Sequence, residues 1–115
     1  MPRSKLQQIA DELRHSVRTS PLTKAWIMYT LPGGLDIVYG RDLDQSQYRL
    51  ALRREGVPPS GHEVDICADV FSVPPETTPN AYTRREEHPA TKRKITYHVV
   101  ELVWRELDMT SEARP

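Results

Sequence analysis

The strongest strand signal in the chain is the run ITYHVVELVW at residues 95–104. It is rich in β-branched and aromatic residues, which favour strands because they pack well on a pleated surface. Apolar residues occupy both faces of its C-terminal half, a pattern typical of a strand that is covered on both sides. The sequence therefore predicts a central strand at 94–105, and earlier segments must supply its neighbours.

Three further strands are predicted before this one. The β-prone runs WIMYTL at 26–31 and LDIVY at 35–39 flank Pro32-Gly33-Gly34. Glycine takes the positive φ angles of a tight turn at no steric cost, so the two runs are expected to form a hairpin. The run YRLALR at 48–53 alternates large apolar residues with arginine or alanine. This alternation indicates an antiparallel strand with one buried face.

Residues 5–19 are predicted to form a helix. Apolar residues recur there at three- and four-residue spacing, which gives one apolar stripe: Leu6, Ile9, Ala10, Leu13 and Val17. Ser4 and Gln7 have the spacing of a capping box, which favours a helix start at this point. Ser20-Pro21 ends the helix, because the residue before a proline disfavours the helical region.

The segment 60–73 fits two structures. Val64, Ile66, Ala68 and Val70 alternate with polar residues or cysteine, as in a strand. Ser60 and Glu63 nevertheless form a second capping-box pattern, and Pro74-Pro75 supplies a stop signal. We prefer a helix, because its start and stop signals agree with a helical apolar face.

Residues 74–91 contain four prolines and almost no large apolar side chains. They are expected to form a long loop, which in a compact domain is either mobile or functional. Residues 108–115 are expected to form a frayed C-terminal tail. The order is then helix, three strands, helix, long loop and strand, with the sheet and the second helix between residues 24 and 73.

Together these elements predict an α+β fold. A mostly antiparallel sheet of about four strands would carry both helices on one face, because few residues are available for parallel crossovers. The length of 115 residues is common for one domain, so residues 1–115 are expected to form a single domain.

The charge balance of the chain is neutral. Sixteen basic residues offset sixteen acidic ones, so the chain lacks the overall positive charge that is usual for a nucleic-acid binder. One cysteine excludes an internal disulfide. The first residues do not resemble a signal peptide and no apolar run is long enough to span a membrane, so we expect a soluble cytoplasmic protein without membrane contact.

A cluster of basic residues around the predicted loop is the first candidate site. An aromatic residue beside several arginines and lysines suits contact with nucleic-acid bases and phosphates. The candidate residues are Tyr82, Arg84, Arg85, Lys92, Arg93 and Lys94, with Arg49, Arg53 and Arg54 from the third strand. A solvated loop explains the same charges, and Glu86-Glu87 in its middle would repel phosphate.

An acidic face on the second helix is the other candidate. Glu63, Asp65 and Asp69 could dock a basic region of a protein partner or hold a divalent cation. Ordinary amphipathicity explains these carboxylates equally well, and docking is a better interpretation than a metal site.

Catalytic, metal and cofactor motifs are not recognisable in this sequence. The four histidines have no shared spacing, and Cys67 on an apolar helix face is expected to be a buried small residue. Trp26 and Trp104 are expected to anchor the core, whereas an exposed tryptophan would mark an interface. We therefore expect no catalytic residue, no bound metal and no cofactor.

The sequence leaves three functional hypotheses open. The first is a non-catalytic binding or adaptor protein that contacts a protein partner or a second copy of itself, through a sheet edge or the acidic helix face. The second is a nucleic-acid-binding protein that uses residues 82–94. The third is a small enzyme whose site converges from distant segments.

Overall fold

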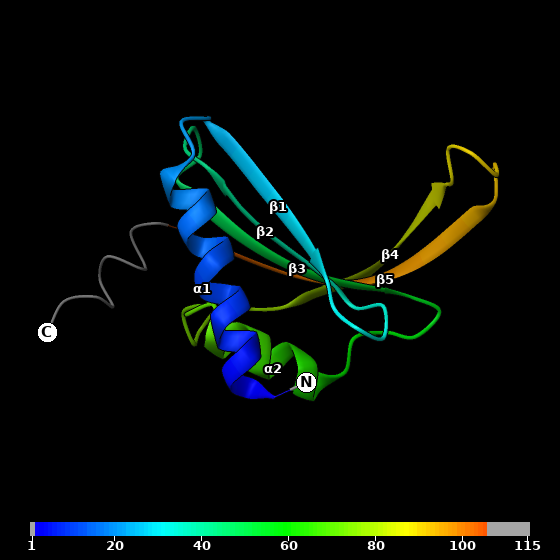
Figure 1. Cartoon of the computed structure of the whole chain (residues 1–115), viewed down its shortest axis with the longest axis horizontal. Coiled ribbons are helices and arrows are strands. Elements are labelled where there is room, and N and C mark those ends of the chain that lie inside the picture. Colours follow the sequence, from blue (N-terminus) through cyan, green and yellow to red (C-terminus); the bar gives the residue numbers. More distant parts are fainter. Residues whose placement is uncertain (1, 106–115) are drawn as a thin grey trace, which may run out of the picture.

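The computed structural model describes residues 2–105, which form one five-stranded antiparallel sheet and two helices (Figure 1). The elements are α1 (Arg3–Thr19), β1 (Lys24–Thr30), β2 (Asp36–Asp42), β3 (Gln47–Glu55), α2 (Gly61–Val70), β4 (Asn80–Glu87) and β5 (Lys94–Arg105). The strands lie in the order β1-β2-β3-β5-β4. The predicted tail at 108–115 lies outside the described residues.

Both helices lie on the same face of the sheet (Figure 1). The apolar stripe of α1 is buried there, from Leu6 to Val17, as are Val64, Cys67 and Val70 of α2. An aromatic cluster connects the layers, because Phe71 after α2 stacks on Tyr39 of β2 with ring centroids 5.1 Å apart. The predicted α+β fold with helices on one face is confirmed.

The start of α1 differs from the prediction. The helix begins at Arg3 after Pro2, and no side chain caps it, so the expected capping box of Ser4 and Gln7 is wrong. The first turn is closed instead by the backbone N–H of Leu6, which donates to the carbonyl of Pro2 at 3.2 Å. Gln7 donates to the carbonyl of Val70 at 3.1 Å and so connects α1 to α2. The Gln7 side chain therefore contributes to the contact between the two helices and not to a cap of α1.

The preference for a helix at 60–73 is confirmed by α2. The backbone N–H of Glu63 donates to the Ser60 hydroxyl at 3.1 Å, and the N–H of Ser60 donates to the Glu63 carboxylate at 2.8 Å. This reciprocal capping box satisfies two N–H groups that would otherwise lack partners at the helix start. Cys67 and Val70 then face the core.

The expected loop at 74–91 is wrong for eight of its 18 residues. Residues 80–87 form β4, an edge strand that pairs antiparallel with β5 along its whole length. A turn at 88–93 joins the two strands, with the His88 N–H donating to the Arg93 carbonyl at 2.8 Å. The sheet therefore has five strands, and the order is α-β-β-β-α-β-β rather than α-β-β-β-α-β.

The predicted central position of 94–105 is confirmed, but the expected cover on both faces of its C-terminal half is wrong, because both helices lie on one face and Val103 on the other is 39% exposed. β5 pairs with β3 on one side and with β4 on the other. On the helix-covered face Leu102 and Trp104 are buried, and the Trp104 ring stacks on Tyr48 with centroids 6.0 Å apart. The predicted hairpin also forms, closed by the Leu31 N–H donating to the Leu35 carbonyl at 2.8 Å.

Candidate functional site

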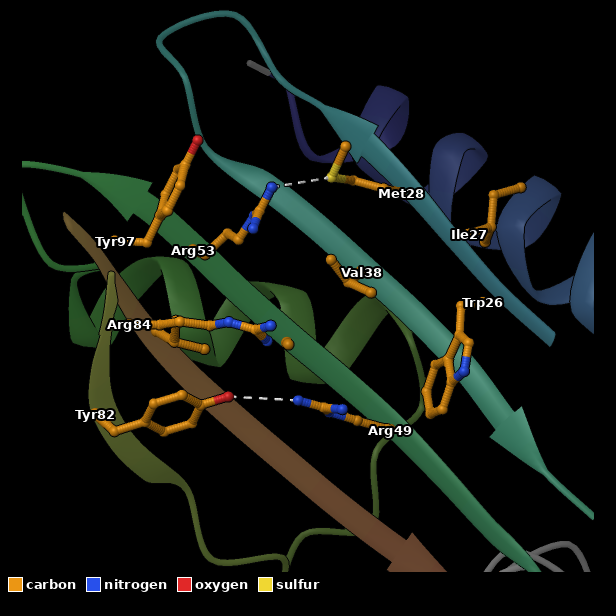
Figure 2. Close-up of a pocket in the computed structure, with 11 residues that line it drawn as sticks. Trp26, Ile27, Met28, Val38, Arg49, Arg53, Tyr82, Arg84 and Tyr97 are labelled. Atoms are coloured by element: carbon orange, nitrogen blue, oxygen red, sulfur yellow. Dashed lines mark hydrogen bonds between the residues drawn. The ribbon is translucent and has the colours of Figure 1, made fainter. Parts of the chain in front are cut away.

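A groove lies on the face of the sheet opposite α1 and α2, which we call the open face (Figure 2). Every strand contributes side chains to it, at alternate positions except for Ile27 of β1, because successive side chains of a strand point to opposite faces. The volume is about 360 Å³, and the lining residues are Trp26, Ile27, Met28, Val38, Arg49, Ala51, Arg53, Tyr82, Arg84, Tyr97 and Val99.

The hollow shape follows from side-chain size. The middle strands contribute small residues to the floor, namely Val38 and Ala51, with Val99 beyond them. Figure 2 shows large side chains on either side: Trp26 and Met28 rise from β1, whereas Tyr82 and Tyr97 rise from β4 and β5. Small residues between large ones produce a groove without any break in the backbone of the sheet.

Trp26 lies across the first two strands because β2 has a glycine beneath it. Trp26 pairs with Gly40, and a Cβ atom added at Gly40 would lie 1.6 Å from Cε3 of the indole. The Arg49 guanidinium carbon is 5.6 Å from the centroid of the same ring, within cation–π range. Trp26 is nevertheless 48% exposed, unlike the buried Trp104. The expectation of a core anchor is therefore wrong for Trp26, and its exposure matches the interface alternative.

Arg49 belongs to a polar cluster with Tyr82 and Glu101. Its guanidinium forms an ion pair with the Glu101 carboxylate and donates to the Tyr82 hydroxyl at 3.4 Å (Figure 2). The Tyr82 hydroxyl donates in turn to Glu101 at 3.2 Å. These contacts hold Arg49 against β5 and fix the orientation of the Tyr82 ring over the groove.

Arg53 is the centre of a second cluster. Its Nε is 2.9 Å from Asp36 Oδ2, and its Nη1 is 3.3 Å from Glu86 Oε1. The guanidinium also lies over the Tyr97 ring, 4.3 Å from the centroid, and contacts the Met28 sulfur at 3.6 Å (Figure 2). Arg53 therefore connects β2, β4 and β5 across the groove.

Arg84 is the most exposed cation of the groove. Its side chain is 64% exposed, and its Nε lies 3.3 Å from the Glu86 carboxylate that Arg53 also contacts. Among the described residues that line the groove there are three arginines and no carboxylate. The carboxylates that balance these arginines lie at the margin, so the lining presents guanidinium groups among apolar and aromatic side chains.

The structure distributes the predicted basic site over several places. Tyr82, Arg84, Arg49 and Arg53 come together at the groove. Arg85 and Lys94 point toward the other face of the sheet by strand alternation, and Lys92 and Arg93 lie in the turn. Arg54 forms an ion pair with Glu63. A nucleic-acid role for the whole set stays a prediction.

Two of the three predicted acidic residues have partners within the chain. Glu63 pairs with Arg54 and Asp69 pairs with Arg3, whereas Asp65 is exposed. The hydrogen bond from Arg54 is the main reason why the pKa of Glu63 lies below its usual range. Internal ion pairs reduce the net negative charge that this helix face offers to a basic partner. Its docking role also stays a prediction.

The Glu63 pair should make stability depend on pH. A carboxyl whose pKa is lowered by folding stabilises the protein above its unfolded pKa, and this contribution is lost as the pH falls through the folded pKa. Glu63→Gln keeps the capping box but removes the charge. The variant should therefore unfold at lower urea concentration than the parent near pH 7, and the difference should shrink as the pH falls below the usual range of a glutamate carboxyl. A difference that is constant over this range would contradict the assignment.

Cys67 and the histidines lie away from the groove. Cys67 is buried, as expected, and burial raises the pKa of its thiol to about 11, so the reactive thiolate is scarce at neutral pH. His88 is in the β4–β5 turn, where Nδ1 accepts from the Ala90 N–H at 3.2 Å. Within residues 2–105 no group of three or more histidine, cysteine or acidic side chains is placed to hold a metal ion.

Sequence reasoning missed the β1 side of the site, Trp26 and Met28, and the aromatic wall at Tyr97. The run at 26–31 is apolar on both faces, so its pattern does not show which face the helices cover. The only available signal was the glycine at position 40, opposite a run that contains a tryptophan.

Comparison with known proteins adds no assignment: no family model, no curated protein and no solved structure matches the chain. The site must therefore be interpreted from its own chemistry. None of the helices in the described part of the chain is long and apolar enough to cross a membrane.

Proposed function

We propose that this protein is a non-catalytic binding module whose open-face groove receives an extended segment of a partner protein. The observation that carries the proposal is the lining of the groove, in which exposed Trp26 and Met28 face Tyr82 and Arg84. Tryptophan, tyrosine, methionine and arginine are the residues enriched in protein interfaces.

The lining also indicates the chemistry of the partner. Arg84 has five N–H donors and shares its carboxylate, Glu86, with Arg53, so it retains donors for an incoming acidic group. The neighbouring aromatic rings and the Met28 side chain suit aliphatic or aromatic side chains. We therefore propose a segment in which an acidic residue is flanked by apolar residues.

Single-stranded nucleic acid is the second candidate. Aromatic rings and arginines on the face of an antiparallel sheet are typical of proteins that stack bases and contact phosphates. Each of the three groove arginines, however, already has a carboxylate within its ion-pair distance. A phosphate backbone needs several such cations at once, whereas a peptide needs only one acidic contact, at Arg84, and can bury apolar side chains in the groove. The protein segment is therefore favoured.

The test is selection from a phage-displayed library of random peptides about 12 residues long, with the purified chain immobilised. We expect enriched peptides to contain an acidic residue beside apolar ones. Enrichment of basic peptides, or of none, would overturn the proposal. Binding of a labelled single-stranded oligonucleotide at low salt, without peptide enrichment, would replace it with the nucleic-acid function.

Two neighbouring arginines provide a matched pair of variants. Arg84→Gln removes a charge at the groove, whereas Arg85→Gln removes one from the opposite face of the same exposed strand. A selected peptide should bind the Arg84→Gln variant about tenfold more weakly, as expected for the loss of one charged contact. The Arg85→Gln variant should bind like the parent. Equal losses for both variants would indicate a general charge effect and not a groove.

A further inference from the structure

β1 is an edge strand, and the described chain pairs it only with β2. Its outer edge therefore presents backbone groups to solvent. The Leu31 N–H donates to the Leu35 carbonyl, and the Leu43 N–H donates to the Thr23 carbonyl. Hydrogen-bonded and non-hydrogen-bonded pairs alternate in an antiparallel ladder, so the odd-numbered residues of β1 bond to β2. The N–H and C=O groups of Lys24, Trp26, Met28 and Thr30 then point outward.

The two edges of the sheet differ in how they are protected. β4, the other edge, has four consecutive charged residues at 84–87, which discourage pairing with another strand. In β1 the six residues at 25–30, AWIMYT, have no charge and no proline. Trp26, Met28 and Tyr29 there are exposed. An uncharged, apolar edge of this kind is a template for another strand.

We propose that β1 pairs antiparallel with β1 of a second copy of this chain, with Ile27 facing the partner's Ile27 across a two-fold axis. This register overlaps the seven residues of the strand completely. In this register the residues whose backbone N–H and C=O groups point outward form hydrogen-bonded pairs with the partner strand, and each pair contains about two hydrogen bonds. The combined sheet would contain the strands of both copies, with β1 at the centre.

The side chains agree with this register. Trp26 is opposite the partner's Met28 in this register, so the pairing places two uncharged residues opposite each other. Lys24, the only charged residue of the strand, faces the partner's Thr30 and not another lysine. The chain has no net charge, so long-range repulsion does not oppose association. The interface is isologous, as is usual for two-fold dimers.

The pairing would also extend the open face. Trp26 and Met28 of each copy form one wall of the groove, so the two grooves would meet at the β1–β1 junction. The dimer does not depend on the proposed peptide function, since its hydrogen bonds use backbone groups at the edge of the sheet.

A disulfide reports this register directly. Residues facing each other in a non-hydrogen-bonded pair have Cα atoms about 4.5 Å apart, within reach of a disulfide. Ile27→Cys should therefore form a covalent dimer on mild oxidation. Tyr29→Cys is the matched control, because its counterpart in the partner would be about 14 Å away, four residues along the strand. The native Cys67 is buried and is the same in both variants.

A proline variant tests the interface without a cross-link. The N–H of Met28 points outward, so Met28→Pro should remove no β1–β2 hydrogen bond but should block the edge. Sedimentation should show a parent dimer at concentrations up to about 0.5 mM and a monomeric variant with an unchanged circular dichroism spectrum. The proposal is overturned if the parent is a monomer and Ile27→Cys does not cross-link. It is also overturned if Tyr29→Cys cross-links as well as Ile27→Cys.

Discussion

Arg53→Ala should lower the free energy of unfolding by about 2–3 kcal/mol, one of the largest effects expected on the open face. The change removes the ion partner of Asp36, a residue only 8% exposed, and the contact with Glu86. It also removes the guanidinium from the Tyr97 ring. An unpaired carboxylate with little access to water costs more than the lost attraction alone. The expected loss of stability is smaller than for a fully buried ion pair, because the Arg53 side chain is 22% exposed to solvent.

The measurement is urea unfolding of single and double variants. Asp36→Asn removes the negative charge and nearly keeps the shape of the side chain, so it should recover part of the loss in the Arg53→Ala background. Arg84→Ala, at an exposed position of the same face, should change stability by less than about 0.5 kcal/mol. If Asp36→Asn and Arg53→Ala destabilise additively, the two residues do not form the proposed pair.

Gly40→Ala should destabilise the protein by about 2–3 kcal/mol, although alanine is normally the better residue in a strand interior. The added methyl group would lie 1.6 Å from Cε3 of Trp26, so the indole must move. Moving it breaks the contact with Arg49 and removes one wall of the groove. The sign of the effect therefore tests where the ring lies.

A second substitution separates this clash from backbone effects. Trp26→Ala removes the ring and leaves space for the new methyl group, so the double variant Gly40→Ala, Trp26→Ala should be more stable than Gly40→Ala alone. Chemical unfolding monitored by circular dichroism avoids reliance on tryptophan fluorescence. A Gly40→Ala protein as stable as the parent would show that Trp26 does not lie over Gly40.

The elements that the sequence predicted correctly are those with local signals. The stripe from Leu6 to Val17 specifies α1, and the reciprocal bonds of Ser60 and Glu63 specify the start of α2. β5 was predictable from its run of β-branched and aromatic residues, although the expected cover on both faces is wrong: Val103, on the open face, is 39% exposed. In each case the residues that define the element are neighbours in the sequence.

β4 could not be predicted in the same way. As an edge strand beyond the helices it buries little, so its sequence, NAYTRREE, has no apolar alternation. It is ordered by pairing with β5, for example Arg84 opposite Tyr97 and Glu86 opposite Ile95. Such pairing depends on the neighbouring strand and not on local propensity.

The candidate site was predictable only in part. Tyr82, Arg84, Arg49 and Arg53 were expected to act together, and they do line one groove. Their partners Trp26 and Met28 come from a distant segment, and assigning them to the open face requires knowing which face α1 covers. Both faces of β1 are apolar, so the sequence alone does not decide this.

The most direct test of the central claim, that the open-face groove binds a protein segment, uses the two tryptophans as reporters. Trp26 lies on the open face, whereas Trp104 lies on the helix-covered face, is 3% exposed and has its ring centroid 6.3 Å from that of Tyr39. A peptide selected from the library can be titrated into ¹⁵N-labelled protein while both indole N–H signals are followed by NMR. We expect the Trp26 signal to shift and the Trp104 signal to stay. A shift of Trp104 with an unchanged Trp26 signal would contradict the claim.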